Sequence, residues 1–277
     1  MERCSAAAPL VVLGGKVLPF IEVLGKQIPM YSVMTLLGAG LGLLYFKLRE
    51  KKMRFPEADA ELALIYCFLG LLIGAKILYL ITVWPEFVYD LRFVFSQTDT
   101  FLQKYLQGGF VFYGGMLGAV FSGWLYCRIN KLDFFALCEV LMPVFALLHA
   151  FGRFGCFCMG CCYGTLSETL GIAYTHSPVA PNGIPLLPVQ LFEAAFELTM
   201  SGILAIMARR GNSGRAMLSL WSVSYGVFRF GLEFFRGDSI RGSIGIFSTS
   251  QWISIFVVIL GIVVWVWRKT KKVEETA

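Results

Sequence analysis

One short segment of the chain concentrates most of its reactive side chains. The segment HAFGRFGCFCMGCCYG, residues 149–164, holds a histidine, an arginine and four cysteines. His149 precedes Arg153 by four residues, so on a helix the two side chains share a face. A guanidinium is a fixed cation with a fork of donors that suits a phosphate, and a neighbouring imidazole can accept a proton. The pair therefore predicts anion binding next to a group that titrates near neutral pH.

A second charged group has helical spacing further along the chain. In YGVFRFGLEFFRGD, Tyr225, Arg229 and Glu233 follow one another at intervals of four residues, which stacks them on one helix face. One interpretation is an ion pair between Arg229 and Glu233 that neutralises itself and holds helices together. The other is that Glu233 orients Arg229 to receive a phosphate oxygen.

A third polar stripe lies in the segment LPVQLFEAAFEL. Gln190, Glu193 and Glu197 are spaced to share one face of a helix. Glu193 is a candidate partner for Lys76, a cation inside another apolar segment. A purely structural role is the alternative for this stripe, as it is for Glu139.

Four of the eight cysteines fall in the first segment, at Cys156, Cys158, Cys161 and Cys162. The order C-x-C-x₂-C-C matches no usual zinc spacing and lacks a second pair of ligands. Three interpretations stay open: a thiolate metal site, a disulfide in an oxidising compartment, or small side chains filling a glycine-rich turn. The unusual spacing argues against the first, so no metal ligand is expected.

The elements that must position these residues are membrane helices. The mean hydropathy is +0.70, 57% of residues are hydrophobic and only 15% are charged, a composition typical of a polytopic membrane protein. The chain is therefore expected to be an all-α integral membrane protein with about seven transmembrane helices, each able to cross a core of roughly 30 Å. The predicted spans are 31–47, 60–84, 109–127, 133–151, 188–208, 214–235 and 250–267.

Lysine and arginine concentrate in the connections on one side of these spans, within residues 47–54, 128–131, 209–215 and 268–272. The positive-inside rule makes that side cytoplasmic, with the N-terminus outside and the C-terminus in the cytoplasm. The net charge of +6 mostly reflects this topology. It indicates no nucleic-acid partner.

The whole chain, 1–277, is predicted to be a single polytopic domain. Residues 1–30 are expected to form an external segment on the membrane surface, because Glu2 and Gly14-Gly15-Lys16 do not fit a signal peptide. Residues 152–187 contain Pro178, Pro181 and Pro185 and are followed directly by Pro188, so they are expected to form a turn-rich external loop. Residues 84–108 form the other long stretch that we expect to be non-helical.

The glycine-rich run GGFVFYGGMLGAVFSG begins the third predicted span. Gly114, Gly118 and Ser122 have the small-xxx-small spacing that lets membrane helices approach closely. Tyr113, at the outer end of this span, is expected to present its hydroxyl to a cavity.

Seven short motifs follow one another along most of the chain, about residues 19–260. They are PMYSVMTLLG around Tyr31, GAKILYLI around Lys76, GGFVFYGGMLG around Tyr113, GRFGCFCMGCCYG around Arg153, LPVQLFEA around Gln190, YGVFRFGLEFFRGD around Arg229 and SQWISI around Gln251. Their order resembles that of the prolipoprotein diacylglyceryl transferase family, bacterial membrane enzymes that lipidate lipoprotein precursors.

The resemblance implies transfer of a diacylglyceryl group from phosphatidylglycerol to the thiol of a lipobox cysteine, with release of glycerol 1-phosphate. The implied partners are phosphatidylglycerol, the lipobox segment of a preprolipoprotein and the lipid bilayer, in the bacterial cytoplasmic (inner) membrane, with no diffusible cofactor. The residues expected to carry the chemistry are His149, Tyr113, Arg153, Arg229 and Glu233. The residues expected to contact substrates are Arg153, Tyr31, Tyr225, Gln190, Cys156 and Cys161.

The chain departs from the family pattern at three positions. Tyr113 stands where the family usually has a histidine, and Cys156 and Cys161 stand where it usually has asparagine and glutamate. Tyrosine titrates near pH 10 and is a poor general base, so we predict that His149 activates the thiol. Two alternatives are a transferase of the same fold with another acceptor, and a non-enzymatic redox or metal-thiolate membrane protein.

Overall fold

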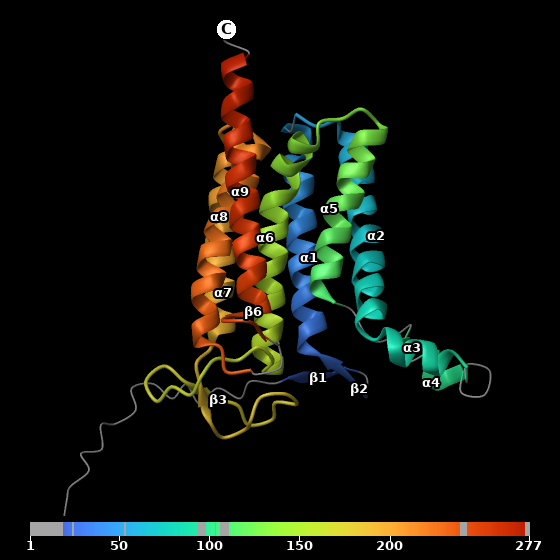
Figure 1. Ribbon diagram of the computed structural model, residues 1–277, viewed down its shortest axis with the longest axis vertical. Helices are drawn as coiled ribbons and strands as arrows, with labels where there is room; N and C mark the ends of the chain where they lie inside the picture. Colours follow the sequence, from blue (N-terminus) through green and yellow to red (C-terminus); the bar gives the residue numbers. More distant parts are fainter. Residues whose placement is uncertain are drawn as a thin grey trace, which may run out of the picture. The chain divides into compact units, whose positions relative to one another are not determined.

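The computed structural model describes residues 19–23, 25–52, 54–92, 98–102, 104–105, 111–238 and 243–274, which are mostly helical (Figure 1). Seven helices in this part of the chain have 18 residues or more: α1 (Met30–Arg49), α2 (Glu57–Thr82), α5 (Phe112–Ile129), α6 (Phe134–Met159), α7 (Val189–Arg209), α8 (Gly214–Leu232) and α9 (Thr249–Glu274). Five of them, α1, α2, α6, α7 and α9, are long and apolar enough to cross a membrane. The prediction of a mostly helical chain with membrane-crossing helices is confirmed.

Two helix predictions need correction. Helix α6 continues to Met159, eight residues beyond the predicted end at 151, so Arg153 lies within a helix. Gly152 and Gly155 do not interrupt it, because membrane helices tolerate glycine. The stretch 84–108 contains two short helices, α3 (Trp84–Leu91) and α4 (Thr98–Leu102). With eight and five residues, they are too short to give the signal of a membrane span.

Within the described residues, three short antiparallel strand pairs accompany the helices. They pair β1 (Phe20–Val23) with β2 (Lys26–Pro29), β3 (Ile172–Ala173) with β4 (Pro185–Leu186), and β5 (Ser243–Ile244) with β6 (Phe247–Ser248). The first hairpin belongs to the predicted external segment 1–30. Residues 1–18 and 24 of that segment lie outside the described residues.

The chain divides into two compact units, one made of Met1–Arg49 with Cys138–Ala277 and the other of Glu50–Leu137. In the second unit, α2 and α5 run side by side (Figure 1). A methyl group added at Gly74 would overlap the backbone of Gly114 and Gly118, and one added at Gly70 would overlap Ser122. The predicted close approach of small residues is therefore confirmed, with α2 as the partner helix.

The first unit is a bundle of α1, α6, α7, α8 and α9. Helix α1 packs on α6 where Gly38 faces Phe151 and Gly42 faces Val144. Helices α8 and α9 pack through Gly226 and Gly261. Figure 1 shows that the end of α6, the start of α7, the end of α8 and the start of α9 lie at the same end of this bundle. This end collects the polar residues singled out in the sequence.

Large apolar side chains are exposed along the outer surfaces of these helices. Leu36 on α1, Ile65 on α2, Phe121 on α5 and Phe256 on α9 each have more than half of their surface accessible. Such a surface is unfavourable in water and is the natural surface toward lipid. In the first unit His149, Glu193, Glu197 and Arg229 are instead buried.

Candidate functional site

A buried carboxylate on α7 lies at the centre of the polar cluster. Glu193 is fully buried, and its Oε2 lies 3.1 Å from Nε of Arg153 on α6. Its Oε1 accepts a hydrogen bond of 2.9 Å from the Tyr225 hydroxyl on α8 and lies 3.9 Å from Nε of Arg229. Three helices are thus joined through one carboxylate, and two arginines share it.

The second arginine is held from two sides. Nη2 of Arg229 pairs with Oε2 of Glu233 at 2.6 Å, four residues along the chain, and donates to Oγ of Ser250 on α9 at 3.3 Å. Glu233 is itself fixed by a hydrogen bond of 2.9 Å from Ser248. The predicted Arg229–Glu233 pair is confirmed.

The remaining nitrogen of this guanidinium is unsatisfied. Nη1 of Arg229 is buried and has no hydrogen-bond partner among the described residues. A buried donor without an acceptor is costly, by about 1–3 kcal/mol. Such a donor marks a position that an anionic ligand would satisfy.

His149 lies one helical turn before Arg153 and points toward the same helix. Its Nδ1 is 2.9 Å from Oε1 of the buried Glu197 on α7, and Glu197 also accepts a bond of 3.0 Å from Nε1 of Trp221. The imidazole packs edge-on against Tyr225, with ring centroids 5.3 Å apart. The predicted shared face of His149 and Arg153 is confirmed, since both reach carboxylates of α7.

The α7 stripe was only partly interpreted from the sequence. From the sequence, Gln190 is expected to contact substrate, whereas the spacing of Glu193 and Glu197 fits both a functional and a structural role. The structure pairs Glu193 with Arg153 and Arg229. The spacing in the sequence already indicates that these residues belong together, because Glu193 and Glu197 follow Gln190 by three and seven positions and so lie on the same helix face. Lys76, the suggested partner, donates to the carbonyl oxygen of Tyr105 within the other unit.

Gln190 connects the stripe to the segment after α6. Its Nε2 donates to the carbonyl oxygen of Cys161 at 2.8 Å and lies 3.4 Å from the Tyr174 hydroxyl. The same segment is tied to the turn that follows α8, where Thr165 donates its backbone N–H to the Phe235 carbonyl at 2.9 Å. These bonds hold residues 160–187 against the polar end of the bundle, and the Gln190 amide is used for that attachment.

Of the predicted tyrosines, Tyr31 and Tyr113 lie in different units. Tyr31 begins α1 and packs on Gly155 of α6, where an added methyl carbon would lie 2.9 Å from its ring. It is partly exposed, next to the Arg153 turn. Tyr113 lies in the first turn of α5, in the unit Glu50–Leu137, and is half-buried.

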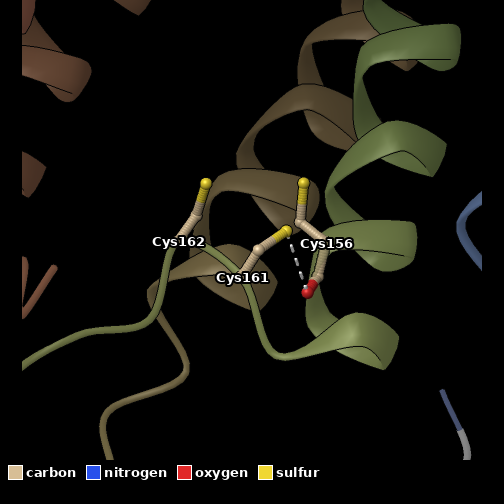
Figure 2. A group of neighbouring side chains, drawn as sticks. All are labelled: Cys156, Cys161 and Cys162. Atoms are coloured by element: carbon tan, nitrogen blue, oxygen red, sulfur yellow. Dashed lines mark hydrogen bonds between the residues drawn. The ribbon is translucent and has the colours of Figure 1, made fainter. Parts of the chain in front are cut away.

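Three of the four clustered cysteines converge at the end of α6. The Sγ atoms of Cys156, Cys161 and Cys162 all lie within 4.8 Å of one another (Figure 2). Cys158, on the same helical turn, is not part of this group. Hydrogen bonds with the Cys156 and Cys161 thiols, and the charges of Arg236 and Arg153, lower the pKa of the Cys162 thiol.

The chain is similar in sequence to one protein family along most of its length. The family profile described as prolipoprotein diacylglyceryl transferase matches residues 19–267. A protein from Clostridium tetani named "Phosphatidylglycerol--prolipoprotein diacylglyceryl transferase" is 34% identical over 244 residues, which are 88% of this chain and 94% of that protein. One from Clostridium perfringens, with the same name followed by 2, is 33% identical over 92% of this chain and 96% of its own length.

Relatives with lower sequence identity cover the chain to a similar extent. A protein of the same name from Cupriavidus pinatubonensis is 27% identical over 88% of this chain and 89% of its own length. The match extends through all seven long helices of this chain, from β1 to the apolar part of α9. On these grounds the chain belongs to the prolipoprotein diacylglyceryl transferase family.

Proposed function

We propose that this chain transfers the diacylglyceryl group of phosphatidylglycerol to the thiol of a lipobox cysteine in prolipoproteins. The names of the relatives from two clostridia support the activity and both substrate classes. The observation that carries the proposal for this chain is the buried arginine pair around Glu193. The donor of Arg229 that lacks an acceptor supports it further.

Arg153 and Arg229 would bind the phosphate diester and stabilise the charge that develops as it leaves. Both guanidiniums are largely buried, with 13% and 3% of their side chains exposed. Fixed donors are worth most in such a dry site, where removing one typically costs about 100-fold or more in rate. Glu193 and Glu233 orient these donors and balance their charge before the lipid binds.

His149 is proposed to accept the proton of the attacking thiol. Its Nδ1 is engaged with Glu197, an arrangement that fixes the ring and stabilises the imidazolium that forms. Tyr225 and Tyr31 are proposed to line the substrate site, and Tyr113 to donate a hydrogen bond. Retention of full activity by His149→Ala together with loss in Tyr113→Phe would reverse these roles.

The proposed topology has seven transmembrane helices, because α5 and α8, with 18 and 19 residues, also reach the length needed to span a bilayer. The N-terminus is proposed to be outside and the C-terminus in the cytoplasm, following the Lys and Arg distribution. The polar end of the bundle would then face outward. That end is where a secreted precursor and a lipid of the bacterial cytoplasmic membrane could meet.

The test is a transfer assay in proteoliposomes that contain phosphatidylglycerol and a lipobox peptide. Arg229→Ala should lower the rate of diacylglyceryl adduct formation at least about 100-fold. Arg215→Ala is the matched control, because Arg215 lies at the other end of α8 over the Trp267 ring, 5.0 Å from its centroid. The control should retain the wild-type rate. Equal rates for both variants would refute the assignment of Arg229.

A further inference from the structure

The thiol group formed by Cys156, Cys161 and Cys162, here called the thiol trio, comes from a specific backbone motif. The N–H of Gly160 bonds the carbonyl of Phe157 and the N–H of Cys161 bonds that of Cys156, both at 3.1 Å. With Gly160 at a φ of +73°, this is a Schellman motif that ends α6. The motif brings the side chains at its first and last positions together. In this chain both are cysteines.

The third cysteine joins the trio through an unusual backbone conformation. Cys162 has a φ of +63°, in the left-handed region that costs roughly 1–2 kcal/mol for a residue with a side chain. Figure 2 shows its sulfur pointing in the same direction as that of Cys156, with the Cys161 sulfur between them. All three residues are half-buried, so a ligand can reach the sulfurs.

The spacing of the sulfurs suits a metal ion. Three sulfurs bound to one ion at about 2.3 Å are separated by about 4 Å, and the three Sγ atoms here lie within 4.8 Å of one another. A disulfide would need two of them at about 2.0 Å and would leave the third outside. Small movements of three side chains would therefore complete a thiolate site without refolding the turn.

Two arginines place fixed positive charge beside the trio. Arg153 on α6 acts electrostatically on Cys156 and Cys162, and Arg236 acts on Cys162. Arg236 is itself held by a two-bonded pair with Asp238, at 2.8 and 2.6 Å. Two fixed cations thus offset part of the charge of a three-thiolate site.

We propose that the thiol trio binds one d¹⁰ metal ion such as zinc, and that the thiol of the acceptor cysteine occupies its fourth coordination position. Three protein ligands with one open position is the arrangement of catalytic zinc sites, whereas structural sites have four. A thiol that coordinates such an ion is deprotonated at neutral pH. The acceptor part of the proposal rests on the proposed function, and the metal part stands independently of it.

The chemistry balances without an oxidant or reductant. On binding, the acceptor thiol gives up its proton to His149, the base of the proposed function, and its sulfur attacks the glycerol carbon that carries the phosphate ester. A carbon–sulfur bond forms as the carbon–oxygen bond breaks, and the electron pair leaves with the phosphate. The proton lost by the thiol is balanced by the phosphate oxygen that is freed when the carbon–oxygen bond breaks, because this oxygen of glycerol phosphate can carry a proton.

Metal analysis of the full chain tests the site itself. Protein in detergent, reduced with a phosphine, is loaded with zinc or with cadmium, dialysed and measured by elemental analysis and by sulfur-to-cadmium absorption. We expect one ion per wild-type chain and one per Cys158→Ser chain, the matched control on the same helical turn. Cys161→Ser and Cys162→Ser should each lose at least nine-tenths of the bound metal. A thermal-melting rise with zinc in wild type, absent in these variants while both remain folded, would separate binding from misfolding.

The metal site and the acceptor role can each be overturned separately. The metal site is refuted if reduced, folded wild-type protein retains no metal, or if Cys158→Ser loses as much as the trio variants. The acceptor role is tested by adding a lipobox peptide and its Cys→Ser form to the cadmium protein. Only the cysteine peptide should increase the sulfur-to-cadmium absorption, and equal spectra would refute that role. Full diacylglyceryl transfer by chelator-treated, metal-free protein would refute the acceptor role while leaving the proposed function intact.

Discussion

Replacing Glu193 by glutamine tests the most connected contact of the polar cluster. The change keeps the shape of the side chain and its ability to accept the Tyr225 hydroxyl. It removes the negative charge that Arg153 and Arg229 share. Two guanidiniums are then left close together in a largely buried position. We expect a loss of folding stability dominated by this uncompensated positive charge.

The magnitude follows from the distances. With an effective dielectric constant of about 20, the attraction across 3.1 Å is about 5 kcal/mol and that across 3.9 Å about 4 kcal/mol. Most of this gross gain offsets the cost of burying the carboxylate. Removing one partner of a buried pair typically costs about 3–5 kcal/mol of folding free energy. We therefore expect Glu193→Gln to lose that amount.

Glu197→Gln is the matched control. Glu197 lies one turn further along α7 and is equally buried, but it binds His149 and Trp221. Its loss should cost about 1–3 kcal/mol, as for buried hydrogen bonds. A difference of about 2 kcal/mol corresponds to roughly 4–8 °C in thermal melting of detergent-solubilised protein. Glu193→Gln should melt at the lower temperature, and equal or reversed melting temperatures would contradict the central role of Glu193.

Two further predictions concern packing and pH. Gly38→Val should destabilise the first unit by about 1–3 kcal/mol, because a Cβ at Gly38 would lie 2.6 Å from Cβ of Phe151. Gly40→Val is the control, because a Cβ at Gly40 meets nothing within 4 Å. Equal melting temperatures of the two variants would count against the α1–α6 contact. The hydrogen bond from Lys104 holds the pKa of Asp90 below its ordinary 3.8. The ionised Asp90 carboxylate therefore stabilises the fold above about pH 4, and this stabilisation is lost as pH falls through the lowered pKa. Hydrogen exchange of α3, corrected for intrinsic rates, should accordingly be faster at pH 3 than at pH 6 in wild type and fast at both in Asp90→Asn. Equal protection of α3 at both pH values in wild type would disprove that the ionised Asp90 carboxylate stabilises this helix.

The sequence predicted the long helices because their apolar length is a strong local signal. It misjudged the end of α6, since Arg153 and the cysteines look like the start of a loop when burial is unknown. The extension to Met159 depends on the Schellman motif at Gly160. Short helices such as α3 were missed because an amphipathic segment of eight residues gives no membrane signal.

The sequence predicted the separate groups of the site but not how these groups pair between helices. The intervals between Tyr225, Arg229 and Glu233, and between His149 and Arg153, depend only on helical geometry and were correct. The choice of partners depends on how helices pack, so the joint pairing of Glu193 with two arginines could not be read from spacing. The convergence of three thiols was likewise hidden, because the spacing C-x₄-C-C from Cys156 becomes compact only when a left-handed turn folds Cys161 and Cys162 back over Cys156.

The most direct test of the account is the stoichiometry of transfer by wild-type protein in proteoliposomes. Peptide mass and released glycerol phosphate would be measured in the same reaction with phosphatidylglycerol and a lipobox peptide. We predict equal amounts of the diacylglyceryl adduct and glycerol phosphate, and neither product with a Cys→Ser peptide. Folded protein that yields no adduct, or that releases glycerol phosphate without an adduct, would contradict the proposed transfer.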